Sequence, residues 1–124
     1  MKALHTDNAP KALGPYSQAI LSGANLYISG QIAINPATGE MVQDSIEAEA
    51  EQVMNNIEAI LEEARMNFSY VVKTTIFVTD IAYFGPVNEV YAKYFKSNPP
   101  ARSFVQVAGL PKGARVEIET VAIR

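Results

Sequence analysis

The sequence predicts an α+β domain in which about six strands form one sheet and two helices pack on one face of it. Residues 70–79 are rich in β-branched and aromatic side chains, as strands are. Residues 45–66 repeat apolar side chains every three or four positions, which is the period of an amphipathic helix. The length of 124 residues suits a single domain, residues 1–124, whose core is large enough to fold without disulfides.

The first third of the chain predicts an arm and then a hairpin. Residues 1–15 are polar and broken by proline and glycine, so they form a short strand or extended arm and a loop. The rigid Gly-Pro pair before Tyr16 sets the direction in which this ring leaves the turn. Residues 18–22 and 25–34 predict two strands joined by a short loop. Alternation places four residues on one face of the second strand: Leu26, Ile28, Gly30 and Ile32.

Gly30 is an unusual residue for the interior of a strand. A glycine at such a position indicates a bulge, or the close approach of a ligand or of another backbone segment.

Two segments predict helices. For residues 45–66, Asp44 or Ser45 is the expected N-cap, and acidic residues follow in the first turn, where the helix dipole favours them. Residues 84–95 predict the second helix, whose aromatic stripe is expected to face the core. Asn88, in the first turn of this helix, is expected either to cap the chain or to reach a site.

The C-terminal stretch predicts two more strands, residues 103–108 and 115–123, separated by glycine and proline. If these strands pair around the turn, Arg102 and Glu117 lie on one sheet and serve one pocket. A guanidinium grips a carboxylate through two parallel hydrogen bonds, and a carboxylate can activate a water. The alternative is that both are solvated charges, since lone charges on strands usually face solvent.

One face of the predicted sheet is left without a helix to cover it. Two helices cover only one face, and the strands carry apolar side chains on both. An uncovered apolar face needs a partner. We therefore expect a homo-oligomer with closed symmetry.

Composition argues against several classes of function. Ten Lys and Arg residues against 13 Asp and Glu give a net charge of −3, so a nucleic-acid partner, which normally meets a basic patch, is not expected. The chain has no Cys, and its single His, His5, cannot build a His-rich metal site. No apolar run approaches the roughly 18 residues that span a membrane, and the N-terminus lacks a signal-peptide core, so we expect a cytoplasmic protein without membrane partners.

Motifs along essentially the whole chain resemble those of the RidA/YjgF family, the reactive-intermediate deaminases. The matches run in order and without visible gaps. The motifs that carry the resemblance are GPYSQA at 14–19, ISGQI at 28–32, NPATGE at 35–40, NEVYAKYF at 88–95 and PPARSFVQVAGLPKGARVEIETVA at 99–122.

The resemblance implies a chorismate-mutase-like fold that assembles as a homotrimer, with a central barrel of sheets, helices outside and a site in each cleft between subunits. It implies hydrolysis of 2-iminobutanoate or 2-iminopropanoate, and of their enamine tautomers, to the 2-oxo acid and ammonia. No metal or organic cofactor is implied, because a protonated imine is already electrophilic and needs mainly orientation and one placed water.

The resemblance also implies the roles of site residues. Arg102 would grip the substrate carboxylate, and Glu117 would position and activate the attacking water. Tyr16 would form a wall of the pocket and come from the neighbouring subunit. Gly30 would let its backbone approach the ligand, and Asn88 would add a polar contact.

Ser103 and Phe104 complete the expected substrate contacts. Many family members have Cys at the position of Phe104, so a thiol is not available here and the size or preference of the substrate is in question. Glu119 shares the face of Glu117 by parity, and only the family resemblance favours Glu117 as the catalytic carboxylate.

Two other functions stay open. A non-catalytic trimer would sense a small 2-oxo acid through Arg102 and regulate a partner protein, and Glu117 would then be dispensable. An RNA-directed activity is also known in the family, but the acidic net charge counts against it.

Overall fold

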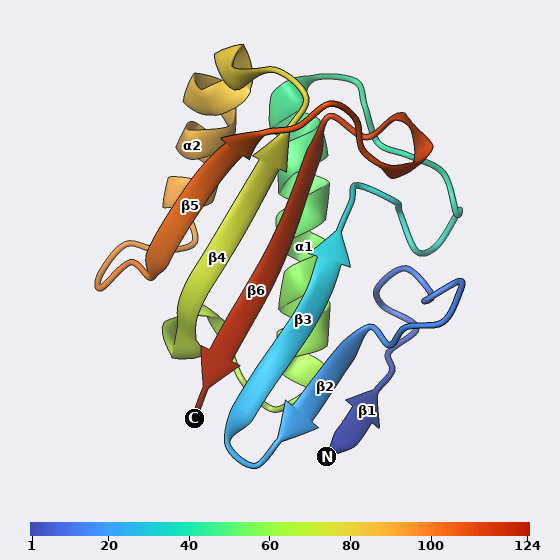
Figure 1. Cartoon of the computed structure of the whole chain (residues 1–124), viewed down its shortest axis with the longest axis vertical. Coiled ribbons are helices and arrows are strands. Elements are labelled where there is room, and N and C mark those ends of the chain that lie inside the picture. Colours follow the sequence, from blue (N-terminus) through green and yellow to red (C-terminus); the bar gives the residue numbers. More distant parts are fainter.

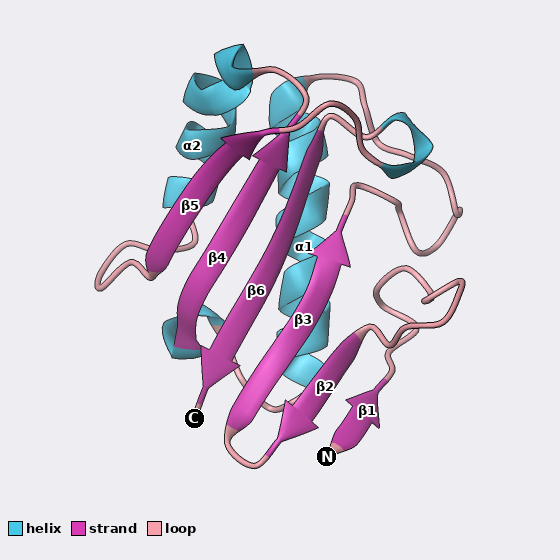
Figure 2. Cartoon of the chain, viewed as in Figure 1, coloured by secondary structure: helices cyan, strands magenta, loops and turns pink.

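The computed structural model describes residues 1–124 and contains a six-stranded sheet with two α-helices on one side (Figure 1, Figure 2). The predicted α+β class is therefore confirmed. The strands run in the order β1-β2-β3-β6-β4-β5, and β4 and β5 form the one parallel pair. The strands and helices are β1 (Lys2–Leu4), β2 (Ala19–Ser22), β3 (Asn25–Gln31), α1 (Ile46–Glu63), β4 (Val71–Val78), α2 (Phe84–Ala92), β5 (Ala101–Gln106) and β6 (Val116–Ile123).

Helix α1 begins and ends through local hydrogen bonds. Ser45 is the N-cap, and its hydroxyl accepts a hydrogen bond from the amide of Ala48 at 3.0 Å. The helix ends before the predicted residue because Arg65 takes a left-handed φ of 58°. The amides of Arg65 and Met66 then donate back to carbonyls of the last turn, at 2.9 and 2.8 Å, and close the helix.

The two C-terminal strands do not pair with each other around the turn, although the sequence allows such a pairing. Strand β4 lies between them, parallel to β5 and antiparallel to β6 (Figure 1). The connecting segment, which contains the 3₁₀ turn Pro111–Gly113, therefore crosses the end of β4. Glycine and proline correctly marked a turn here, but turn residues do not determine which strands pair.

Gly30 lies in a bulge of β3, which was one of the two alternatives that the sequence offered for this glycine. Between Ile28 and Gln31 the register against β6 shifts, with three steps along β3 for two along β6. Ile28 and Gln31 are therefore both buried, and Gly30 faces the open side of the sheet. The predicted common face from Leu26 to Ile32 is wrong beyond Ile28, because the extra residue reverses the alternation.

The core lies between the sheet and the two helices and contains 23 buried hydrophobic residues. Both helices lie behind the sheet in Figure 1, and the near face is uncovered. Tyr27, Val105 and Ile123 expose large apolar side chains on this open face. The partner predicted for this face stays a prediction. No helix has the length and apolar character that crossing a membrane requires.

Candidate active site

Arg102 lies on the edge strand β5, and its side chain points to the helix side of the sheet. Its register partner on β4, Thr74, is buried and hydrogen-bonded to the hydroxyl of Tyr91 at 2.7 Å. The Nη1 of Arg102 donates a hydrogen bond to Oδ1 of Asn88 on α2 at 2.7 Å. The fold thus brings together two of the predicted site residues, Arg102 and Asn88.

Three aromatic rings surround the guanidinium of Arg102. Its Cζ lies 5.0 Å from the ring centroid of Tyr91 and 5.7 Å from those of Phe84 and Phe104. The rings of Phe84 and Phe104 meet edge to face at 4.9 Å. Cation–π attraction holds the guanidinium without neutralising its charge, and none of the ion pairs in the structure includes it. Arg102 is therefore available to bind an anion.

Arg102 opens onto a cavity of about 380 Å³. Asn88 and Tyr91 line it from α2, and Pro99 and Pro100 line it from the segment before β5. Proline fixes the backbone torsion φ, so this part of the wall is locally rigid. The cavity, its cation and the Asn88 amide can together receive a small acid.

Glu117 lies on β6 with its side chain on the open face, and its carboxyl lies against Gly30. A Cβ atom added to Gly30 would stand 2.7 Å from Oε2 and 2.8 Å from Cδ of Glu117. Real Cβ atoms essentially never come within 3.0 Å of a heavy atom outside their own residue and its chain neighbours, so an alanine here would displace the carboxyl. Because Gly30 has no side chain, the carboxyl of Glu117 can lie in this position.

Tyr16, Gly30 and Glu117 line one cavity of about 310 Å³, which we call the Glu117 cavity. Tyr16 is 55% exposed and follows Gly14, whose φ of 138° is open to glycine but strained for other residues. The amide of Tyr16 donates to the carbonyl of Gly14 at 2.9 Å and tightens this turn. Three more predicted site residues are thus brought together.

The pKa of the Glu117 carboxyl is raised above its ordinary value. Partial burial is the larger cause, because it disfavours the ionised form, and the nearby negative charge of Glu119 is the smaller one. The raised pKa lies closer to neutral pH, and a general base is most effective when its pKa is near the pH at which it works. The environment of Glu117 therefore suits proton transfer.

Arg102 and Glu117 lie on opposite faces of the sheet, with β4 between their strands. The cavities that they line share no residue. The expectation that paired strands would place both in one pocket is wrong for a single protomer, because the strands are not paired and the side chains leave opposite faces. We call Arg102 with the cavity that it lines the Arg102 half-site, and Glu117 with the cavity that it lines the Glu117 half-site.

Ser103 and Phe104 also leave opposite faces of β5. Phe104 packs beside the guanidinium of Arg102 on the helix side. Ser103 lies on the open side, and its hydroxyl accepts a hydrogen bond from Nζ of Lys73 at 3.1 Å. The side chain of Ser103 lines neither half-site in one protomer, so its contact with substrate stays a prediction.

The sequence reasoning missed several residues around the two half-sites. Phe84 and Tyr91 were assigned to an aromatic stripe facing the core, yet both contact Arg102. The signal was spacing: they stand four residues before and three after Asn88, which places all three on one side of α2. Lys11 and Lys112 line the Glu117 cavity, and nothing in the local sequence singled them out.

The structure offers no ready set of metal ligands. No three side chains of the His, Cys, Asp or Glu type come close enough to one another to hold an ion. The two half-sites offer the guanidinium, the Asn88 amide, the Glu117 carboxyl, the Tyr16 hydroxyl, two lysine side chains and the backbone.

The model of the family described as Endoribonuclease L-PSP matches residues 6–124. The chain belongs to this family, the RidA/YjgF family. Among RidA/YjgF relatives, the protein DfrA of Myxococcus xanthus is 52% identical over 124 residues, which are 98% of this chain and 95% of DfrA. The human 2-iminobutanoate/2-iminopropanoate deaminase is 50% identical over 123 residues, which are 99% of this chain and 90% of the human protein.

Solved structures of RidA/YjgF proteins share the fold described above. A Rid-family protein of Yersinia pestis superposes with a TM-score of 0.97 at 52% identity, covering 99% of this chain and 98% of its own. TdcF of Escherichia coli, solved with bound serine, superposes with a TM-score of 0.95 at 39% identity, covering 100% of this chain and 99% of its own.

Proposed function

We propose that this protein is a hydrolytic deaminase that converts 2-iminobutanoate, 2-iminopropanoate and their enamine tautomers into 2-oxo acids and ammonia. The observation that carries the proposal is the Glu117 carboxyl, which lies against Gly30 in a cavity and has a raised pKa. Arg102, a cation without an ionic partner, supplies the anchor that a 2-imino acid requires. The names of relatives at about 50% identity support the same reaction.

The proposed enzyme is a homotrimer, in which each site combines the Arg102 half-site of one protomer with the Glu117 half-site of the next. Three features support this arrangement. Arg102 lies on an edge strand, where a neighbour can approach. The open face of the sheet carries exposed apolar side chains. Closed symmetry gives every protomer one copy of each half-site, so all sites are completed at once.

In the proposed mechanism Arg102 binds the substrate carboxylate through its fork, and the Asn88 amide holds the guanidinium in place. Ionised Glu117 takes a proton from a water while the water oxygen attacks C2 of the protonated imine. The product of this step is a neutral-nitrogen carbinolamine. Glu117 then returns the proton to the nitrogen. The C–N bond breaks as the C2 hydroxyl gives its proton to the ionised Glu117 and becomes the carbonyl, and the departing ammonia takes that proton from Glu117 and leaves as ammonium.

The remaining residues orient and enclose the substrate. Tyr16 presents a ring and a hydroxyl at the wall of the Glu117 cavity. The backbone at Gly30 has no side chain to keep a ligand away. Holding a water and an imine in an attack geometry supplies much of the rate gain for such a reaction.

A coupled assay tests the proposal. A threonine dehydratase generates 2-iminobutanoate in the presence of semicarbazide, and formation of 2-oxobutanoate is followed with and without this protein. We expect faster formation with wild type, a loss of about 100-fold in Arg102→Ala and a loss of about 10²–10⁴-fold in Glu117→Gln. Glu119→Gln is the matched control for the carboxylate and should stay within about threefold. Wild-type protein that is folded and gives no acceleration rules out the deaminase.

Non-catalytic binding of a small 2-oxo acid is the second candidate. The Arg102 half-site favours it, because one protomer already presents a cavity, a cation and an amide there without Glu117. This candidate predicts that Glu117→Gln binds 2-oxobutanoate as wild type does, that Arg102→Ala does not, and that neither accelerates imine hydrolysis.

A further inference from the structure

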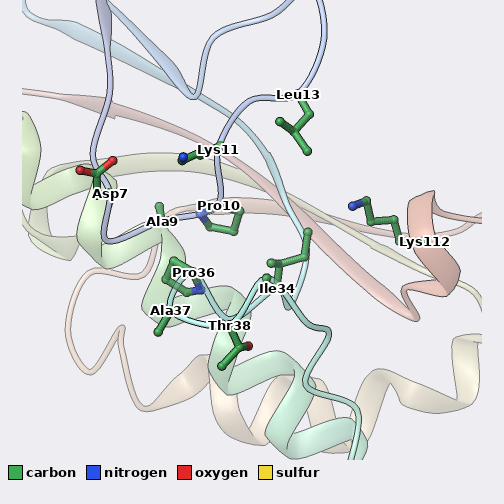
Figure 3. A pocket seen from close by; sticks show the side chains of 11 residues that line it. Asp7, Ala9, Pro10, Lys11, Leu13, Ile34, Pro36, Ala37, Thr38 and Lys112 are labelled. Carbon is green, nitrogen blue, oxygen red and sulfur yellow. The ribbon is translucent and has the colours of Figure 1, made fainter.

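The largest cavity in the protein lies beside the proposed catalytic one and has no part in the mechanism above. Its volume is about 510 Å³, and we call it the vestibule. It lies between the N-terminal arm, the residues after β3 and the turn at residues 36–39 (Figure 3). Figure 3 shows Asp7 on one side of it and Lys112 reaching toward it from the other.

The vestibule and the Glu117 cavity adjoin each other. They share five lining residues, which lie along their common boundary. Leu13 and Ile34 make part of this boundary apolar, and Lys11 and Lys112 are its charged residues. A molecule that extends from Glu117 into the vestibule therefore passes an apolar stretch and meets two ammonium groups.

Neither ammonium group has an ionic partner. The three ion pairs of the structure include neither Lys11 nor Lys112. The one acidic side chain of the vestibule, Asp7, pairs instead with His5 at 2.8 Å. The boundary between the cavities thus carries net positive charge, although the whole chain has a net charge of −3.

Lys112 is also held in a strained conformation. Its φ of 56° and ψ of 30° are left-handed, and Gly113 after it has a φ of 69°. Glycine and asparagine adopt this region far more readily than lysine does. Strained residues of this kind concentrate where a ligand is clamped, and the turn aims this lysine at the boundary of the two cavities.

We propose that the vestibule binds a second anionic group, a carboxylate or a phosphate, on a small acid whose reacting end occupies the Glu117 cavity. Lys112 and Lys11 are the groups that bind this anion, and Leu13 and Ile34 contact the carbon chain between its two ends. The placement of the reacting end in the Glu117 cavity rests on the proposed deaminase function, whereas the proposal of an anion site does not. The substrate class is then extended to imino acids with an acidic side chain.

Binding measurements on an Arg102→Ala background test the anion site without interference from the other cation. The probes are succinate and inorganic phosphate, titrated by calorimetry. We expect both to bind, and Lys112→Asn, which keeps a residue that tolerates the left-handed turn, to weaken binding about 3- to 10-fold. Lys96→Gln removes an exposed lysine that lines no cavity and should leave affinity unchanged. Absence of binding, or equal affinity in all variants, overturns the proposal.

Kinetics with two imines identify the source of the anion. 2-Iminoglutarate, generated from glutamate by an amino-acid oxidase with catalase present, is compared with 2-iminobutanoate. A KM that rises about 3- to 10-fold in Lys112→Asn for 2-iminoglutarate alone assigns the site to substrate. Weakened anion binding with both KM values unchanged contradicts the extended substrate class and leaves an anion site for a separate effector. If neither imine is hydrolysed, the deaminase fails, and the binding titrations still decide the anion site.

Discussion

Arg102 and Glu117 leave opposite faces of one sheet, and β4 lies between the strands that carry them. One protomer therefore does not present both groups to one small substrate. The proposed site combines Arg102 of one copy with Glu117 of another.

Mixed assemblies test this division of the site. Arg102→Ala and Glu117→Gln chains are each expected to be inactive alone. When they are co-expressed and assemble at random, a complete site forms wherever an intact Arg102 meets an intact Glu117, each with a chance of one half. Activity should return to about a quarter of the wild-type value per site. Separately purified and unmixed variants are the control, and mixed assemblies without activity contradict the shared site.

Gly30→Ala tests whether the carboxyl position matters for the reaction. The new methyl group would stand 2.7 Å from Oε2 of Glu117, so the carboxyl must move. We expect kcat to fall about 10- to 100-fold, because displacements of about an ångström have effects of this size. Gly109→Ala is the matched control, since a Cβ there meets no atom within 4 Å. Equal kcat values for the two variants would show that Gly30 has no positioning role.

Much of the fold could be predicted because it is encoded locally. The apolar period and a serine cap define α1, and β-branched residues define β4. Gly30 indicated either a bulge or a close approach at its position, and the structure has the bulge. The order of strands in the sheet is not local, and the insertion of β4 between β5 and β6 left no mark in the turn that joins them.

The site could be predicted only in its members and not in its arrangement. Arg102 and Asn88 lie together in the structure, and so do Tyr16, Gly30 and Glu117, while the roles given to them stay predictions. Strand pairing and the bulge determine the face of the sheet from which each side chain projects. Neither of them follows from alternation along a single strand.

Glu117→Gln should change how stability depends on pH. The native pKa of Glu117 is raised, so above the ordinary Glu pKa of about 4.3 the unfolded chain loses this proton before the native protein does. The native state then binds more protons, and this group lowers the free energy of unfolding as pH rises through the window between the two pKa values. The glutamine variant lacks this decline, so above the window its free energy of unfolding should rise relative to that of wild type.

Chemical denaturation at a fixed protein concentration, from about pH 4 to pH 8, measures this difference. Glu119→Gln is an informative comparison, because removing that charge should reduce the decline without abolishing it. A difference between wild type and Glu117→Gln that is constant with pH contradicts the raised pKa.

Glu49→Ala should destabilise the protein strongly. The side chain of Glu49 is 0% exposed, and its carboxylate accepts hydrogen bonds from the amide and Nε of Arg115 at 2.7 and 2.8 Å. Removing this carboxylate leaves the Arg115 amide without its acceptor and the partly buried guanidinium without its ionic partner, so we expect a loss of about 3 kcal/mol in the free energy of unfolding. Glu47→Ala, at an exposed position of the same helix, should cost less than about 1 kcal/mol. Similar losses in both would show that the contacts of Glu49 with Arg115 contribute little.

Phe104→Cys tests how the aromatic rings around Arg102 hold this proposed substrate anchor. Phe104 contacts Phe84 and lies 5.7 Å from the Cζ of Arg102, so losing the ring removes one of three cation–π contacts. We expect KM for 2-iminobutanoate to rise about 3- to 10-fold with little change in kcat, because the guanidinium is held less firmly before and during the reaction alike. Phe68→Cys removes a ring that packs on Tyr94 and Phe95 instead, and should lower stability while leaving KM unchanged. A KM that responds equally to both substitutions would mean that Phe104 acts only through general stability, whereas a selective rise places it in the substrate-binding half-site.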